Sequence, residues 1–371
     1  MNAQSLYDLG PVLHLLVMGA LVAMLPISWV WLRNPQASTV RRVQLLTMIT
    51  LFLTFDLVMF GAFTRLTDSG LGCPDWPGCY GHASPVGAHA MIQDAQTQMP
   101  TGPVTHSKAW IEMIHRYMAM AVGGLILTLA SFAWFRRWQG RSDSAVGWPT
   151  LTLVWVCVQG AFGALTVTMK LFPLIVTLHL LGSLVLLVLL TLQIRRMRSL
   201  AWQATAISPA LFVALVMGFV LLFGQAFLGG WVSTNYAVLA CNTFPQCQNS
   251  WWPLMDFEQG FALWRHLGMA ANGDVLSFEA LTAIHYAHRL AAYVVLVYLA
   301  LLGWRLHRVA ALQSTARLML LVLLLQLLTG LSNVVLDWPL VAAVLHTGGS
   351  AALVVLLVWM LTGVRPSRTG F

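Results

Sequence analysis

Apolar stretches long enough to cross a membrane recur along the whole chain. They cover approximately residues 12–32, 43–64, 109–135, 148–169, 172–193, 209–232, 278–303, 316–335 and 339–362. A helix rises ~1.5 Å per residue, so about 20 apolar residues span a ~30 Å hydrocarbon core. The stretches lack the alternation of strands, and lipid requires backbone groups to pair within each span. The pattern therefore predicts an all-α integral membrane protein with nine transmembrane helices.

The composition excludes a soluble protein. Of the 371 residues, 58% are hydrophobic and 9% are charged, whereas soluble domains carry roughly 25% charged residues. The formal net charge of +8 is compatible with a nucleic-acid partner, but the 20 Lys and Arg residues lie in short clusters between the apolar stretches. That arrangement is typical of membrane orientation, so we expect membrane lipid around the protein and no nucleic acid.

The basic clusters fall on alternate connections and predict the orientation. One side carries fourteen arginines: Arg33, Arg41, Arg42, Arg136, Arg137, Arg141, Arg195, Arg196, Arg198, Arg305, Arg308, Arg317, Arg365 and Arg368. By the positive-inside rule this side is cytoplasmic, which places the N-terminus outside and the C-terminus inside. Asp8, and no basic residue, precedes the first stretch, so we interpret it as a true span in a bacterial cytoplasmic (inner) membrane.

The chain contains an internal repeat. Residues 61–79 and 229–247 correspond at a constant offset of 168, with matching Gly, aromatic, Leu, Cys, aromatic-Pro and Cys positions. Further pairs match in later spans: Gln159 with Gln326, Gly163 with Gly330, His179 with His346, and His115-Arg116 with His288-Arg289. The repeat predicts two pseudo-symmetric four-helix bundles, residues 43–198 and 209–364, preceded by an extra N-terminal transmembrane helix and cytoplasmic loop, residues 1–42.

Four of the five cysteines form two Cys-x5-Cys pairs in outer loops. Because these loops face an oxidising compartment, we expect the disulfides Cys73–Cys79 and Cys241–Cys247. Each is either a structural clip or a redox-active disulfide that accepts or passes electrons. Zinc is disfavoured because the pairs lack the Cys-x2-Cys spacing. The fifth, Cys157, lies in a span, where we expect a packed apolar residue.

Four histidines lie at one depth, each about seven residues below the outer end of its span: His115, His179, His288 and His346. Ionisable residues are rare within a bilayer and mark candidate sites. Two imidazoles facing each other across a bundle suit heme iron, which predicts one heme per half, between His115 and His179 and between His288 and His346.

The residues beside these histidines differ between the halves. Arg116 and Arg289 either bind heme propionates or extend outward to the surface. Glu112 in the first half corresponds to His285 in the second. A carboxylate there can relay protons or polarise an oxidised carbon, whereas an imidazole indicates ligand support or an alternative axial ligand. Intramembrane Asp56 either aids proton delivery or makes a polar helix contact.

The motifs together resemble those of the heme A synthase family over residues 43–362. They are residues 65–77, Glu112-Met113-Ile114-His115-Arg116, His179-Leu180-Leu181-Gly182, His288-Arg289 and His346-Thr347-Gly348-Gly349. The resemblance implies an oxidoreductase that converts the C8 methyl of heme O to the formyl group of heme A by successive hydroxylations, with water as oxygen source.

The resemblance also implies which residues take part. Heme b is expected on His288 and His346, and substrate heme O near His115, His179 and Glu112. Cys73 and Cys79 are linked to catalysis in this family. The first span and the long loop at residues 80–107 depart from the family pattern.

Expected partners are a heme O synthase, cytochrome oxidase assembly factors and an unidentified electron acceptor or donor. Two other classes fit part of the pattern. A diheme, quinol-linked electron-transfer cytochrome accounts for the histidines but leaves the Glu112/His285 difference unused. A membrane thiol-disulfide oxidoreductase accounts for the loop cysteines and leaves the histidines idle.

Overall fold

The computed structural model describes residues 10–140, 146–198 and 204–367. Within them, nine helices are long and apolar enough to cross a membrane. Each coincides with one predicted stretch, and the largest difference at an end is in the fifth, which extends to Arg198 instead of residue 193. The all-helical membrane class is therefore confirmed. Three residues used for the predicted orientation lie outside the described residues: Asp8, Arg141 and Arg368.

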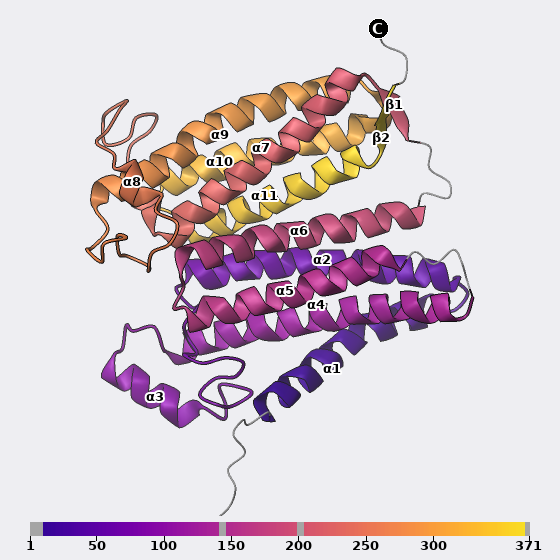
Figure 1. The fold of residues 1–371 in the computed structure, drawn as a ribbon, viewed down its shortest axis with the longest axis horizontal. Coiled ribbons are helices and arrows are strands. Elements are labelled where there is room, and N and C mark those ends of the chain that lie inside the picture. The colour runs from indigo at the N-terminus through magenta and orange to yellow at the C-terminus, as the bar shows by residue number, and fades with distance from the viewer. Residues whose placement is uncertain (1–9, 141–145, 199–203, 368–371) are drawn as a thin grey trace, which may run out of the picture. The chain divides into compact units, whose positions relative to one another are not determined.

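The chain divides into two compact units, residues 1–171 and 172–371. The first contains α1 (Gly10–Arg33), α2 (Thr39–Leu66), the short α3 (His89–Gln98), α4 (His106–Trp138) and α5 (Gly147–Thr168). Helix α4 packs against α1, α2 and α5 (Figure 1). The extra N-terminal helix α1 is thus part of the packing of this unit.

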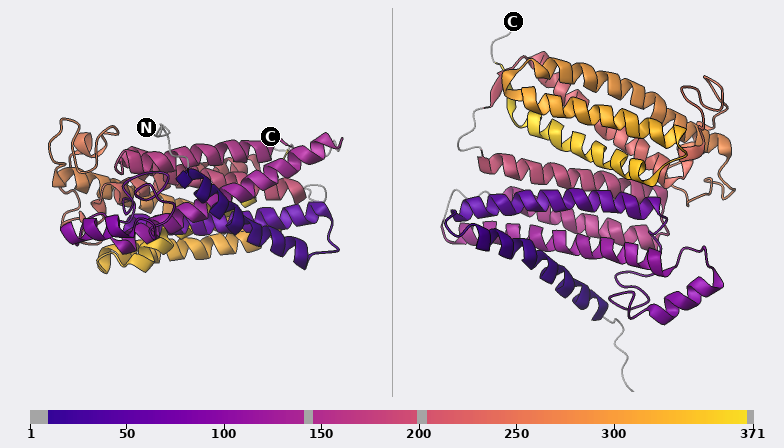
Figure 2. Two further views of the ribbon diagram at one scale, coloured as in Figure 1. Left: turned by 90° about the horizontal axis from the view of Figure 1, so that it is seen from below. Right: turned by 180° about the vertical axis from the view of Figure 1, so that it is seen from behind.

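The second unit contains five long helices: α6 (Pro173–Arg198), α7 (Pro209–Thr234), α9 (Phe278–His307), α10 (Gln313–Val335) and α11 (Leu340–Leu361). Helix α7 packs against α6, α9 and α11, and α10 packs between α9 and α11 (Figure 2). Short elements join them: η1 (Ala237–Leu239), α8 (Phe257–Gly260) and η2 (Ala310–Leu312). The boundary between the two units precedes α6, whereas the predicted first half includes α6. The limits 43–198 and 209–364 of the two halves stay a prediction.

A small parallel sheet also belongs to the second unit and was not expected from the sequence. Strand β1 (Thr205–Ile207) pairs with β2 (Val364–Pro366), in the register Thr205 to Val364. The pairing joins the segment before α7 to the segment after α11.

Hydroxyl side chains define where several long helices begin. Ser38, Thr105, Ser208 and Ser277 each accept a hydrogen bond from the backbone N–H three residues further on. Such N-caps satisfy one of the amide groups that have no partner in the first turn. They fix the starts of α2, α4, α7 and α9. Helix α4 carries Glu112, His115 and Arg116, and α9 carries His285, His288 and Arg289.

Candidate functional site

Both predicted disulfides are present. Cys73 and Cys79 close the first disulfide loop, residues 73–79, and Cys241 and Cys247 close the second, residues 241–247. All four cysteines are buried. The expectation for Cys157 was wrong: its side chain is exposed on α5 and is not packed inside the protein. The apolar sequence around Cys157 led us to expect packing inside the protein. On a membrane-spanning helix, an exposed apolar side chain contacts lipid instead.

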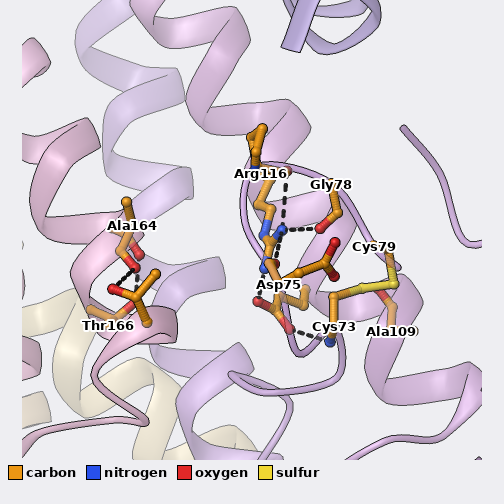
Figure 3. A network of polar contacts seen from close by, with 12 residues as sticks. Cys73, Asp75, Gly78, Cys79, Ala109, Arg116, Ala164 and Thr166 are labelled. Atoms are coloured by element: carbon orange, nitrogen blue, oxygen red, sulfur yellow. Dashed lines mark hydrogen bonds and ion pairs between the residues drawn. A yellow bond between two sulfur atoms is a disulfide. The ribbon is translucent and has the colours of Figure 1, made fainter. Parts of the chain in front are cut away.

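The first disulfide loop is bound to α4 through a carboxylate and a guanidinium group. Glu112, 4% exposed, accepts a hydrogen bond at Oε2 from the Cys73 N–H (2.8 Å) and pairs through Oε1 with Nη2 of Arg116. Nη1 of Arg116 donates to the carbonyl oxygens of Asp75 (3.0 Å), Pro77 (3.1 Å) and Gly78 (Figure 3). The loop carbonyls and Glu112 together accept the hydrogen bonds of the partly buried guanidinium group of Arg116.

The second disulfide loop is bound to α9 in the same manner. His285 accepts a hydrogen bond at Nδ1 from the Cys241 N–H (3.2 Å). Arg289 donates through Nη1 to the carbonyls of Thr243 (2.7 Å) and Gln246 (2.9 Å) and through Nη2 to that of Cys241 (3.1 Å). Nδ1 of His285 is thus occupied by the second disulfide loop.

The two arginines therefore have a structural role that the sequence analysis missed. Both guanidinium groups donate hydrogen bonds to carbonyl oxygens of the disulfide loops. Arg289 also lines the cavity described below. Heme-propionate binding by Arg116 and Arg289 stays a prediction.

His288 and His346 line one cavity in the second unit. They come from α9 and α11, and most of the other lining residues are apolar, with Gln225, Gln326 and Tyr293 among the polar ones. Nδ1 of each imidazole has a side-chain neighbour at 3.0 Å, Gln225 for His288 and Thr329 for His346. Two imidazoles in a largely apolar cavity are a donor set of the kind that holds heme iron, so these residues fit a heme.

A glycine on a neighbouring helix makes room for each of three histidine rings. A Cβ added to Gly61, Gly229 or Gly330 would lie 3.0–3.1 Å from Cε1 of His115, His288 or His346, respectively. These glycines belong to the repeat, but the sequence analysis gave them no role. Each glycine recurs together with its histidine, and this recurrence could have indicated that the two residues are in contact.

The remaining candidates of the first predicted site lie on separate units. His115, on α4, stacks near Phe60 of α2, with ring centroids 6.3 Å apart. His179 lies on α6, and its buried Nδ1 has no hydrogen-bond partner among the described residues. The pairing of His115 with His179 stays a prediction. Asp56 is partly buried on α2, one turn before Phe60, and its role in proton delivery also stays a prediction.

Comparison with known proteins agrees with the motifs. The family model described as cytochrome oxidase assembly protein (COX15-CtaA) matches residues 44–358. A protein of Shewanella oneidensis named heme A synthase is 40% identical over 315 residues, which cover 84% of this chain and 94% of that protein. Heme A synthases of Bradyrhizobium sp. strain BTAi1 (28% identical, 89% and 95% covered) and Halalkalibacterium halodurans (26%, 78% and 86%) are also similar. With a disulfide loop, an arginine and a histidine repeated in both halves, the chain belongs to the COX15-CtaA family of cytochrome oxidase assembly proteins.

Proposed function

We propose that this protein is a heme A synthase, an oxidoreductase that converts the C8 methyl group of heme O to the formyl group of heme A. Family membership and the names of the relatives support this function. The structural observation that carries it is the position of Glu112, which holds the first disulfide loop in the way that His285 holds the second. The first half thus has a carboxylate where the second half has an imidazole.

The reaction defines what the chain must do. Conversion of a methyl to a formyl group by successive hydroxylations, with oxygen from water, releases four electrons and four protons. The chain binds heme O near His115 and His179, and the electrons pass to an acceptor outside the chain. Glu112 accepts a proton released at the reacting carbon, or stabilises the positive charge that develops there.

Two further groups complete the proposal. Heme b, held by His288 and His346, supplies one-electron transfer when bound. Cys73 and Cys79 take part in catalysis, as the family resemblance implies, and the N–H of Cys73 donates to Glu112.

The proposed architecture has two pseudo-symmetric four-helix halves after an N-terminal helix. The protein spans the bacterial cytoplasmic membrane, with its N-terminus outside and its C-terminus inside. A heme O synthase supplies the substrate, and cytochrome oxidase assembly factors are the expected recipients. The matching contacts of the two disulfide loops support the twofold repeat.

Identification of the bound hemes tests the function. We expect chromatography of hemes extracted from purified protein to give heme b together with heme O or heme A. Heme b alone, at two per chain, would support the electron-transfer cytochrome instead. Absence of heme would support the thiol-disulfide oxidoreductase instead. All four disulfide cysteines are buried, which does not favour exchange with a partner thiol.

Substitution of Gly330 by valine is expected to lower heme b content by about 10-fold. The added Cβ alone would lie 3.1 Å from Cε1 of His346, and the valine methyl groups would push the ring from its position. Loss of a contact that orients a metal ligand typically weakens metal binding 10- to 100-fold, and we expect a displaced ring to have an effect of this size. Heme b per protein is measured by the pyridine hemochrome spectrum. Gly224→Val on α7, where a Cβ meets nothing within 4 Å, is the control, and equal heme loss in both variants would contradict the prediction.

A further inference from the structure

Helix α6, which carries His179, packs against α7 and α11 in the second unit. Near the start of α6, the hydroxyl oxygens of Thr177 and of Thr234, on α7, lie 3.1 Å apart and share a hydrogen bond. Both residues are buried. Hydrogen bonds between side chains of neighbouring transmembrane helices contribute to helix association. The threonine pair therefore holds the first turns of α6 at one height against α7.

The same part of α6 packs closely on a glycine of α7. Gly230 is buried, and a Cβ added there would lie 3.1 Å from Cδ2 of Leu180 and 3.2 Å from Cγ2 of Thr177. Small residues at such positions let two transmembrane helices approach each other. A larger side chain at Gly230 would push α6 away from α7 or rotate it.

These contacts determine the direction in which His179 points. Successive residues of a helix are ~100° apart, so Thr177 and Leu180, which both touch Gly230, share one face of α6. His179 follows Thr177 by two positions and lies on nearly the opposite face, directed away from α7. Its buried Nδ1 has no hydrogen-bond partner among the described residues. The position of this nitrogen therefore depends on the rotation of α6.

An outer loop of the second unit holds the start of the same helix. The ring of Phe172, 2% exposed, lies 4.8 Å from that of Trp264 and 5.6 Å from that of His266, measured between centroids. Between these two loop residues, the buried Arg265 donates through Nη2 to Oδ1 of Asn235 (2.7 Å), the C-cap residue of α7. The end of α7 thus holds α6 twice, directly through the threonine pair and indirectly through this loop.

We propose that Gly230 and the Thr177–Thr234 pair are positioning residues that set the rotation of α6 and so direct the imidazole of His179 to the substrate heme. This inference rests on the proposed function, in which the heme near His179 is first substrate and then product. Loss of a contact that orients a metal ligand typically weakens binding 10- to 100-fold. The interface between α6 and α7 is therefore part of what binds the substrate.

The neighbouring glycine of α7 serves a different histidine. A Cβ added to Gly229 would lie 3.1 Å from Cε1 of His288, on α9, whereas Gly230 contacts α6. His288 lines the second-half cavity, and His179 is not among the residues that line it. Substitutions at the two adjacent glycines should therefore affect different hemes, which makes each the matched control of the other.

The test compares the heme contents of Gly230→Val and Gly229→Val. Hemes are extracted from each purified protein, separated by chromatography and counted per chain. We expect Gly230→Val to contain about 10-fold less heme O and heme A with its heme b retained, and Gly229→Val to lose heme b instead. The heme O or heme A that remains in Gly230→Val should lose low-spin character, and added imidazole should restore it, because a displaced ring leaves an axial position open.

The hydroxyl pair gives a second test that adds no bulk. Thr177→Val should lower the content of heme O and heme A about 5-fold through loss of one buried hydrogen bond, and Thr177→Ser, which keeps the hydroxyl, should restore it. Thr191→Val is the matched control, since that buried hydroxyl of α6 donates to the carbonyl oxygen of Leu187 in its own helix. Thr177→Val also replaces Gly230→Val if that variant does not fold.

Three results decide between the proposals. Unchanged heme O and heme A in Gly230→Val and Thr177→Val would overturn the positioning role. Equal loss of heme b and of the substrate heme in these variants would also overturn it, because the contacts would then support the fold and not one ligand. If the unsubstituted protein contains neither heme O nor heme A, the proposed function fails instead.

Discussion

Replacement of Glu112 by glutamine is expected to reduce heme A formation by about 10²- to 10⁴-fold while bound heme is retained. The range is that of a lost general acid or base. Glutamine has nearly the same shape and can still accept the hydrogen bond from the Cys73 N–H through its amide oxygen. The first disulfide loop should therefore keep its place on α4. The ratio of heme A to heme O in extracted membranes measures the loss, and total heme per protein measures retention.

A second substitution at the same position provides the control. Glu112→His gives the first half the residue found at position 285, which is compatible with a disulfide loop of this geometry. We expect this variant to fold, to bind heme and to form no heme A. Glu112→Ala is less informative, because it removes both oxygens that accept from the Cys73 N–H and from Nη2 of Arg116, whereas glutamine keeps one of them. Normal heme A formation in the glutamine variant would refute the catalytic role.

Replacement of His288 by alanine is expected to remove heme b from the protein. Loss of an axial ligand should weaken binding by more than the ~10- to 100-fold caused by loss of its hydrogen-bond partner. The low-spin absorbance of the dithionite-reduced protein is the readout. Alanine is smaller than histidine and only removes the ring contacts with Gly229 and Gln225. We therefore expect no steric distortion of the cavity.

His285→Ala is the matched control for this prediction, because the two histidines lie within one turn of α9 and both line the cavity. The Nδ1 atom of His285 is bonded to the second disulfide loop, so its loss should loosen that loop and leave heme b bound. The opposite pattern, with heme lost from His285→Ala and kept in His288→Ala, would transfer the axial role to His285.

The helices and the disulfides could be predicted because their causes are local. Twenty consecutive apolar residues determine a span, and the closure of a short loop between two cysteines costs little chain entropy. The repeat added the correspondence between Glu112 and His285, and each of them accepts a hydrogen bond from the N–H of the first cysteine of a disulfide loop.

What the sequence could not reveal depends on backbone atoms brought together over long separations. Arg116 was expected at a heme propionate or at the surface, yet its guanidinium group contacts carbonyl oxygens about 40 residues earlier in the chain. Carbonyl groups are the same in every residue, so no residue type indicates such a site. The three-residue strands β1 and β2 were missed for a similar reason, since they are too short for an alternating pattern and pair across about 160 residues.

That small sheet has a practical consequence for handling the protein. The N–H of Thr205 bonds to the carbonyl of Gly363 (3.0 Å), and the N–H of Ser367 bonds to that of Ile207 (2.8 Å). The segment after α11 thus pairs with the segment that leads into α7. An affinity tag that replaces the residues after Thr362 would remove β2 and this pairing, whereas a tag appended beyond Phe371 would keep both.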